Sequence, residues 1–486
     1  MLWSHILSQL EEKSLLASIP SIDLLLNSTE VIALTKKYDR NLISTLLREI
    51  TNELREKAKE NENLNEPFNK KKIIENLKSK IMDLTGPSLK PILNLTGTIL
   101  HTNFGRASLS SKAIDAMVSV SQNNTNLEFD LLQNVRGYRD EHISKLICYL
   151  TGADAACVVN NNAAALVLLI NTFANKKEVI LSRGELVEIG GSFRIPDMIT
   201  QAGGILKEIG TTNRTHEQDY YNALNQNTGM ILKIHTSNFE IQGFTSNVEE
   251  GKLSKIAKTA KIPFIVDIGS GRLSNWKNFD LPKEPTVQDA ILSGADLICF
   301  SGDKLIGGPQ AGLIVGRADL VERINANPIK RAMRVDKITI AALRATLQSL
   351  LFTEKFEGNS PTFKQINRPL SDIQLTAEII LYPLSKIFEN LAMIRIVDCK
   401  SQIGSGALPT TFLPSKAISI EPLSRFRAQK KDHEIKRIAT ILRHLTTPII
   451  GKLNKGKLLL DLRCLGDPNP FLQQLPELNR KLRHTS

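Results

Sequence analysis

The sequence lacks the features of a membrane or secreted protein. None of its 486 residues fall in an apolar run of about eighteen, the length that a membrane-spanning helix requires. The N-terminus has no basic flank and reaches Glu11 and Glu12 early, which is not typical of a secretory signal. The sequence therefore predicts a cytoplasmic protein.

Cysteine is also scarce. The five cysteines are scattered, and the sequence contains no CxxC pair and no Cys/His cluster. An odd number without such spacing supports neither a disulfide framework nor a zinc site. We expect reduced cysteines in the core, and no metal. They are Cys148, Cys157, Cys299, Cys399 and Cys464.

Basic residues are in excess, and the excess is uneven. The net charge is +12, and hydrophobic (42%) and charged (23%) fractions are those of a globular protein. Residues 416–483 have fifteen Lys/Arg against six Asp/Glu, whereas residues 1–90 have fourteen against thirteen. Such an excess suits a polyanion such as RNA, although most basic patches are only solvated surface.

The most informative stretch is 296–312, DLICFSGDKLIGGPQAG. Its apolar run, Leu297–Phe300, predicts a buried parallel strand, and Lys304 follows in a glycine-rich turn. Open α/β sheets bind ligands where their strands end. A lysine there can form a Schiff base with pyridoxal 5'-phosphate (PLP). A surface lysine in a turn is the alternative.

A second strand, IPFIVDIGSG (262–271), ends in Asp267 and another glycine-rich turn. PLP acts as an electron sink when its pyridine nitrogen stays protonated, so PLP enzymes place a carboxylate against that nitrogen. Asp267 and Lys304, at the ends of two strands, could contact one PLP ring, the carboxylate at its nitrogen and the lysine at its aldehyde. Alone, Asp267 could simply cap a turn.

An anion site is predicted upstream. Residues 157–174 pass from a short strand, through Asn160, Asn161 and Asn162, into an alanine-rich helix. Asparagines cap helices well, and the free N–H groups of a helix N-terminus can hold a phosphate. Ser301 could donate a further hydrogen bond to it. The alternative is an ordinary capped helix.

Two further segments contain polar and basic residues of the kinds that line binding sites. NLTGTILHTNFGRASLS (94–110) is a polar loop that contains His101, Asn103 and Arg106. In KRAMRVDK (330–337), Arg331 and Arg334 are spaced one helical turn apart. Paired guanidiniums suit tetrahedral oxyanions, whereas a solvated helix face is the alternative.

Together these residues closely resemble one family, the bacterial L-seryl-tRNA(Sec) selenium transferases, which are PLP enzymes of fold type I. The ordered stretches that support this resemblance are NLTGTILHTNFGRA, LSRGELVEIGGSFRIPDM, EIGTTNRT, SNFEIQGF, VDIGSGRL, FSGDKLIGGPQAGLIVG, RAMRVDK and QIGSGALP.

The resemblance implies an α/β fold with a mostly parallel, seven-stranded sheet and a homodecamer, a pentamer of dimers. We expect a helical N-terminal domain that contacts tRNA, a linker and helix, a large PLP-binding domain and a small C-terminal α/β domain. Their expected ranges are 1–63, 64–91, 92–350 and 351–486. Within these ranges we predict a helix at about 71–84, a loop at 358–369 and a strand near 393–399.

The resemblance also implies a reaction. Seryl-tRNA(Sec) would lose its β-hydroxyl by β-elimination to an aminoacrylyl intermediate, and selenophosphate would then supply selenium. Lys304 would anchor PLP and move the proton, Asp267 would hold the ring nitrogen, and Asp303 would assist proton handling. By position in the family's motifs, Arg106, Arg331, Arg334, Thr211 and Thr212 would bind selenophosphate.

Three questions stay open at the level of sequence. The residue that stacks on the PLP ring is not identified, and Glu185 is only a guess. The chain could instead be a PLP lyase of a small amino acid or amino-sugar acid that needs no tRNA. It could also be an inactive RNA-binding scaffold, a reading against which the intact Lys304 and Asp267 argue.

Overall fold

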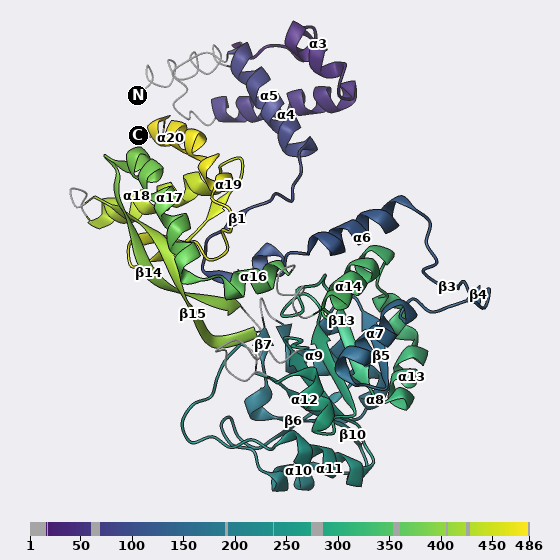
Figure 1. Ribbon diagram of the computed structural model, residues 1–486. Coiled ribbons are helices and arrows are strands. Elements are labelled where there is room, and N and C mark those ends of the chain that lie inside the picture. The colour runs from purple at the N-terminus through teal and green to yellow at the C-terminus, as the bar shows by residue number, and fades with distance from the viewer. Residues whose placement is uncertain are drawn as a thin grey trace, which may run out of the picture. The chain divides into compact units, whose positions relative to one another are not determined.

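The computed structural model describes residues 16, 18–59, 69–189, 193–236, 238–273, 285–352, 360–404, 407–423 and 428–484. The chain divides into two compact units, Met1–Pro91 and Ile92–Ser486 (Figure 1). Residues 1–15 and 60–68, which belong to the expected N-terminal domain and the linker after it, lie outside the described residues. No helix of the described ranges is both long and apolar enough to cross a membrane.

The first unit is helical because its apolar residues recur at helical spacing. Its described helices are α2 (Ile22–Leu26), α3 (Thr29–Thr35), α4 (Arg40–Lys59) and α5 (Lys70–Thr85). Leu47 and Ile50 of α4 pack with Ile73 and Leu77 of α5 in one buried cluster. Helix α5 is the helix predicted at about 71–84, and Asn69 caps it by accepting a hydrogen bond from the Lys71 amide.

The second unit is built on a seven-stranded sheet in the order β5-β13-β12-β11-β10-β6-β9. Every neighbouring pair is parallel except those that β13 makes with β5 and β12. The prediction of a mostly parallel sheet is confirmed. The strands are β5 (Ala155–Val159), β6 (Glu178–Ser182), β9 (Ile205–Ile209), β10 (Thr228–Ile234), β11 (Phe264–Gly269), β12 (Leu297–Ser301) and β13 (Gly312–Gly316).

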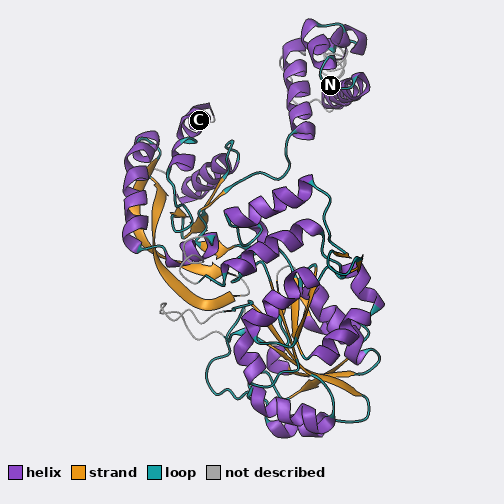
Figure 2. Ribbon diagram, turned by 45° about the vertical axis from the view of Figure 1, so that its right-hand side comes forward, coloured by secondary structure: helices purple, strands orange, loops and turns teal. Residues whose placement is uncertain are grey.

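Helices cover both faces of this sheet, as Figure 2 shows. Successive strand residues alternate between two cores: Val266 and Ile298 lie in one, and Ile265 and Leu297 in the other. This is why the strands read as continuous apolar runs. One core includes α7 (Glu141–Thr151), α10 (Glu217–Ala223), α11 (Glu250–Ala260), α12 (Val287–Leu292) and α14 (Lys337–Ser349), and the other α8 (Asn162–Ala174), α9 (Ile195–Gln201) and α13 (Ala318–Ala326).

The C-terminal part has its own five-stranded sheet, in the order β17-β18-β15-β14-β2. Its strands are β14 (Ala392–Gly404), β15 (Ala407–Pro422), β17 (Lys452–Asn454) and β18 (Lys457–Asp461), together with β2 (Thr98–Leu100). Strand β1 (Leu93–Asn94) pairs with β16 (Ile449–Ile450). The segment 93–100 thus joins strands from the other end of the unit, and β14 includes the strand predicted near 393–399.

Helices pack on this second sheet and fill a third core. They include α17 (Leu370–Phe388), α18 (Ala428–Arg443), α19 (Asn469–Leu472) and α20 (Leu475–His484). The loop predicted at 358–369 is wrong in its described part, because Pro361–Asn367 form helix α16. Ser360 accepts a hydrogen bond from the Phe363 amide and Pro361 takes the first helical position, which together start a helix.

Short elements connect these layers. They are the 3₁₀ helices η1 (Thr102–Phe104), η2 (Arg183–Glu185) and η3 (Pro328–Met333), helix α6 (Ser111–Gln122), and the hairpins β3 (Phe129–Asp130) with β4 (Val135–Arg136) and β7 (Glu188–Ile189) with β8 (Phe193–Arg194). Several of them lie next to the candidate site described below.

Candidate active site

The ends of β11 and β12 bring Asp267 and the Lys304 turn together. Asp267 is paired in register with Cys299, and the Leu305 amide donates to the Ser270 carbonyl over 3.2 Å. Gly271 allows this approach: its φ is +69°, and a Cβ there would lie 2.6 Å from the Ser301 carbonyl oxygen. The two turns therefore form one surface at the carboxyl edge of the sheet.

Asp267 is buried at this edge. Its Oδ1 accepts hydrogen bonds from Asn162 Nδ2 and from the Gly269 amide, both over 2.9 Å. Burial raises the pKa of Asp267 above its usual value, although the Asn162 hydrogen bond and the positive charge of Lys304 oppose the shift. A carboxylate so placed gains most from a cationic partner.

The residues present fit PLP. Lys304 is 4% exposed and lies near enough to Asp267 for its charge to act on that carboxyl. Among the described residues, Asn162 Oδ1 and Ser270 Oγ are buried without a hydrogen-bond partner. A buried acid, a buried amine and two unsatisfied polar atoms at one strand edge match the needs of a polar heterocycle.

The helix predicted to seat the phosphate begins beside Asp267. Asn161 caps α8 by accepting from the Ala164 amide over 2.8 Å. The Asn160 amide donates to the Met333 carbonyl over 3.0 Å, while the Asn162 side chain reaches Asp267. Ser301 is buried at the end of β12. The assignment of these four residues to the phosphate stays a prediction.

The prediction of a polar loop at 94–110 is wrong in its first part, because residues 98–100 form strand β2 and Leu95, Ile99 and Leu100 are buried in apolar cores. Arg106 and Ala107, farther along it, contact the Lys304 turn. Arg106 has a left-handed backbone, with φ of +59°, and its Nη1 donates to Asp303 Oδ2 over 2.9 Å. The Ala107 amide donates to the Asp303 carbonyl over 3.3 Å. His101 stacks on Phe104 with 4.0 Å between ring centroids, and burial lowers the pKa of His101. Arg106 and Asp303 therefore stand directly beside Lys304.

Arg331 and Arg334 occupy a different place. Arg331 lies in η3 and Arg334 directly follows it, so the segment is a 3₁₀ helix rather than an α-helix. Both line a cavity of about 520 Å³ whose other walls come from Glu128, the segment 136–140, the segment 325–328 and Lys330. The bond between Asn160 and Met333 places this segment against the start of α8. Arg106 does not line the cavity.

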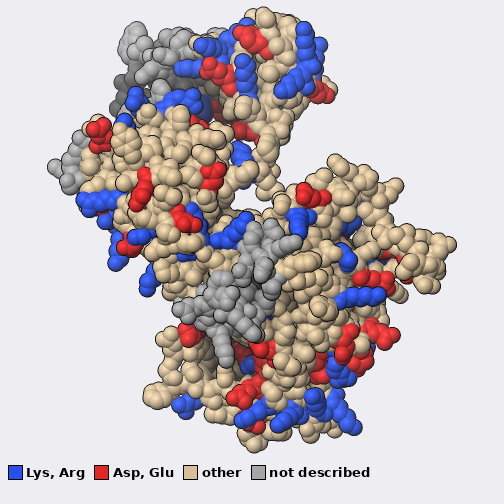
Figure 3. Space-filling model, viewed as in Figure 1, with Lys and Arg blue, Asp and Glu red and all other residues tan. Residues whose placement is uncertain are grey.

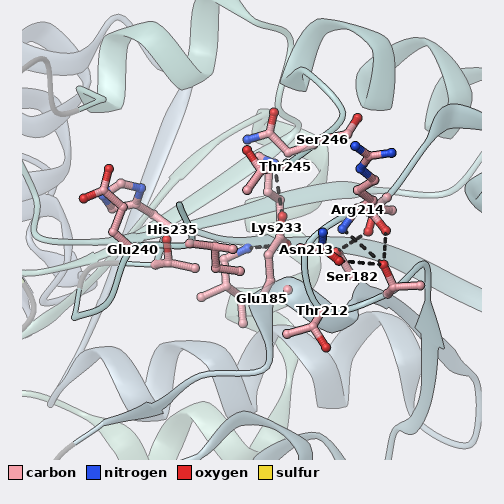
Figure 4. Close-up of a pocket in the computed structure, with 17 residues that line it drawn as sticks. Ser182, Glu185, Thr212, Asn213, Arg214, Lys233, His235, Glu240, Thr245 and Ser246 are labelled. Atoms are coloured by element: carbon pink, nitrogen blue, oxygen red, sulfur yellow. Dashed lines mark hydrogen bonds and ion pairs between the residues drawn. The ribbon is translucent and has the colours of Figure 1, made fainter. Parts of the chain in front are cut away.

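Thr211 and Thr212 line a third place, a cavity of about 350 Å³ at the ends of β6, β9 and β10 (Figure 4). Inside it, Lys233 Nζ contacts Glu185 Oε1 over 3.1 Å, and the Ile234 amide donates to Glu185 Oε2. Glu185 thus pairs with Lys233. Figure 4 shows His235 and Glu240 together at one end of the cavity.

Sequence reasoning missed several residues of these cavities. His235 directly follows β10, and its amide donates to the Asp267 carbonyl over 2.9 Å, so it stands one strand away from the predicted ring site. The signal was available, because MILKIHTSN is a third apolar strand that ends in polar residues. Glu128, Arg136 and Arg139 had no comparable signal, because their cavity forms only where the hairpin and the residues that follow it meet the segment 325–334.

Comparisons with known proteins find similarity over nearly the whole chain. A family model described as L-seryl-tRNA selenium transferase matches residues 92–466. The L-seryl-tRNA(Sec) selenium transferase of Proteus mirabilis is 45% identical over 96% of this chain and 99% of its own length. That of Haemophilus influenzae is 42% identical over 96% of this chain and 100% of its own.

One solved structure supports the fold. D-glucosaminate-6-phosphate ammonia-lyase superposes with a TM-score of 0.55 at 18% sequence identity, covering 82% of this chain and 98% of that one. At this identity the likeness concerns the fold alone, which is that of the PLP-dependent enzymes of fold type I.

Proposed function

The chain belongs to the L-seryl-tRNA selenium transferase family, and from this premise we propose how its own residues perform the family's reaction. The protein is a PLP-dependent enzyme that converts L-seryl-tRNA(Sec) to L-selenocysteinyl-tRNA(Sec) with selenophosphate as the selenium donor. The observation on which the residue assignment rests is the juxtaposition of buried Asp267 and buried Lys304 at two neighbouring strand ends.

The cofactor supplies an electron sink that allows the seryl α-proton and β-hydroxyl to leave. Asp267 faces the ring nitrogen in this proposal and keeps it protonated. Its burial supports the role, because a carboxylate that water does not solvate is strongly stabilised in its charged form by a nearby pyridinium. Asn162 orients that carboxylate through the bond to Oδ1.

Lys304 holds the cofactor covalently and, when released, moves the α-proton. Asp303 and Arg106 adjoin it. Their 2.9 Å ion pair fixes the carboxylate next to the lysine turn and presents the guanidinium toward the same edge. We assign Asp303 to proton handling and Arg106 to the donor.

The phosphate of the cofactor binds at the start of α8. Asn162 is the first residue of this thirteen-residue helix, Asn161 caps it and Asn160 precedes the cap, while Ser301 ends strand β12. A helix N-terminus offers unpaired amides and a positive dipole end to an anion. The cap that Asn161 forms keeps those amides in place.

Selenophosphate binds to Arg106, Arg331 and Arg334, with Thr211 and Thr212 nearby. Guanidinium forks suit its phosphate oxygens. Within one chain these five residues are divided between the Lys304 turn and two cavities. We infer that a second copy of the chain completes the site.

A homo-oligomer is supported by exposed apolar side chains at the β3/β4 hairpin. Leu131, Leu132 and Tyr138 are 71%, 92% and 74% exposed, which is unusual for large apolar residues on a monomer. The hairpin borders the cavity of about 520 Å³ that Arg331 and Arg334 line, which we call the Arg331 cavity. A partner that covers the hairpin would therefore lie next to the proposed donor site. The resemblance favours a decamer, which a mass measurement in solution tests.

We assign tRNA contact to the helical unit Met1–Pro91 and place the reaction in the cytoplasm, where aminoacyl-tRNA is made. Charge alone does not single out the contact surface. Basic and acidic side chains are intermingled on the face drawn in Figure 3. The basic excess of residues 416–483 adds a second region that could meet phosphates.

The deciding experiment is an absorption spectrum of the full chain with PLP, before and after borohydride, followed by mass mapping. We expect a cofactor band and a pyridoxyl group on Lys304. Lys304→Ala should lose both and reduce seryl-tRNA turnover by roughly 1,000-fold or more, while tRNA binding stays unchanged. Lys252→Ala, which removes an exposed lysine paired with Glu217, is the matched control.

Other outcomes would favour other functions. Turnover of free serine without tRNA would indicate a lyase of a small amino acid. An unchanged band in Lys304→Ala would reject that lysine as the attachment point. A chain that binds tRNA but shows no band with PLP would be an inactive RNA-binding scaffold.

A further inference from the structure

One carboxylate in the Arg331 cavity holds three arginines. Glu128 Oε1 accepts from Arg139 Nε over 3.1 Å and lies 3.3 Å from Arg334 Nη1. Glu128 Oε2 accepts from Arg136 Nη2 over 3.0 Å. Arg139 also donates to the Val335 carbonyl. Glu128 therefore joins the β3/β4 hairpin to the segment that contains Arg334.

The cavity around this carboxylate is strongly basic. Arg136, Arg139, Lys330, Arg331 and Arg334 line it together with Glu128 and Asp140, which gives a formal charge of +3. Lys330 pairs with Asp140. In the described part of the chain no ion pair engages Arg331, whose side chain is exposed. The charge balance suits an oxyanion with two or three negative charges.

A fixed carboxylate helps such a site in two ways. Several guanidiniums held close together repel one another, and one anion among them reduces that repulsion. Long side chains also lose rotamer freedom when they bind a ligand, and a side chain that is already held loses less. Arg334 has five N–H donors, so its contact with Glu128 leaves donors for a ligand.

We propose that Glu128 is a positioning residue of the selenophosphate site: it holds Arg334, through a network with Arg139 and Arg136, so that Arg334 and Arg331 bind the phosphate of the donor. This inference rests on the proposed function of the two arginines. Glu128 itself does not touch the donor. Hydrogen bonding from Arg139, supported by Arg136 and Arg334, holds the pKa of Glu128 below its usual value, so it stays ionised at neutral pH.

The direction in which Glu128→Gln changes donor affinity distinguishes two roles of Glu128: it could position the arginines, or it could compete with the donor for them. If Glu128 merely occupied the arginines, removing its charge would raise the formal charge of the cavity and strengthen donor binding. If it positions them, Glu128→Gln weakens donor binding although the cavity becomes more positive. The two roles predict opposite changes in the same constant.

The test uses the full-length holoenzyme. Glu128→Gln should raise the KM for selenophosphate about tenfold and leave the KM for seryl-tRNA and the cofactor band unchanged. Calorimetry with inorganic phosphate should show a similar loss without turnover. Asp319→Asn is the control, because it removes the exposed carboxylate partner of Arg317 outside this cavity. In an Arg334→Ala background, Glu128→Gln should have little further effect.

An unchanged or lower donor KM in Glu128→Gln overturns the proposal. If Arg331→Ala raises the donor KM in the same assay, only the role of Glu128 fails; if Arg331→Ala changes nothing, the proposed donor site itself fails. Should Glu128→Gln lose the cofactor band, Glu128→Asp decides, because it keeps the charge but shortens the reach. An unchanged donor KM in that variant also overturns the proposal.

Discussion

Asp267 is a residue whose burial opposes folding, and its proposed role is to face the ring nitrogen of the cofactor. Its carboxyl is buried among strand ends, and that burial raises its pKa in the folded chain. A group whose folded pKa exceeds its unfolded value resists ionisation in the folded state. The cost is absent below the unfolded pKa and is complete above the folded one. A cationic ring nitrogen would offset it.

We therefore expect Asp267→Asn to lower the activity without lowering the stability of the cofactor-free protein. The amide keeps an oxygen for the Asn162 and Gly269 donors and removes the ionisable group. Protein prepared without cofactor should therefore unfold at the same or a higher temperature than wild type at pH 7, and the difference should shrink as the pH falls. Activity should fall about 100-fold or more.

Thermal unfolding across a pH series, with and without PLP, checks this prediction. Wild type should gain more from PLP than Asp267→Asn does. A variant that is clearly less stable than wild type without cofactor would show that Asp267 has a structural role instead. Asp461→Asn is a useful comparison, because that buried carboxylate accepts hydrogen bonds from Ser401 and Ser415 and belongs to the five-stranded sheet, not to the sheet that contains Asp267.

At the scale of elements, the start of α8 combines a structural and a proposed binding role. Asn161 caps the helix, and the helix packs seven buried residues against the sheet. The cap satisfies one of the four amides that any helix leaves unpaired at its start. The remaining amides are the proposed phosphate donors, so the cap and the anion site depend on the same turn.

Asn161→Ala should therefore have two effects. Loss of the cap should lower the free energy of unfolding by about 1 kcal/mol. Affinity for PLP should fall as well, because the amides of the first turn lose their fixed direction. Denaturant unfolding and a PLP titration measure the two separately.

The control for this prediction is Asn69→Ala, which removes an equivalent cap from α5 in the other unit. It should cost a similar free energy within that unit and leave PLP affinity unchanged. A fall in PLP affinity of equal size in both variants would mean that general destabilisation, and not the α8 anion site, explains the result.

At the scale of the whole molecule, the chain separates into two units with independent cores. The residues proposed to bind the cofactor all lie in Ile92–Ser486, whereas tRNA contact is proposed for Met1–Pro91. A chain that lacks residues 1–91 should keep the cofactor band and the Lys304 adduct. Its affinity for seryl-tRNA should fall at least tenfold, by a rough estimate from lost phosphate contacts.

Spectroscopy and a filter-binding measurement of seryl-tRNA test that separation. Unchanged tRNA affinity in the shortened chain would transfer RNA recognition to the second unit, where residues 416–483 are strongly basic. Loss of the cofactor band would instead show that the helical unit is needed to build the site.

The sequence by itself predicted that Asp267 and the Lys304 turn stand at the ends of two strands of one sheet, which the structure confirms. Asp267 and Lys304 come at the ends of apolar runs, which are typical of central strands buried on both faces, and β11 and β12 pair in parallel and so end at one edge. The capped helix at Asn161 and the fold class were likewise readable, because caps and strand runs are local patterns. The motifs that resemble the family also run in order along the chain, which indicated the reaction.

The tertiary structure alone decided which of these residues meet. The Asn162 bond to Asp267, the Arg106 pair with Asp303 and the Glu128 cluster join residues that are far apart in sequence or on separate turns. Helix α16, in contrast, begins on a local signal, the serine cap and the proline at the first helical position within the segment predicted as a loop. The contacts between elements depend on how elements pack, and no local pattern encodes the distance between two side chains on different elements.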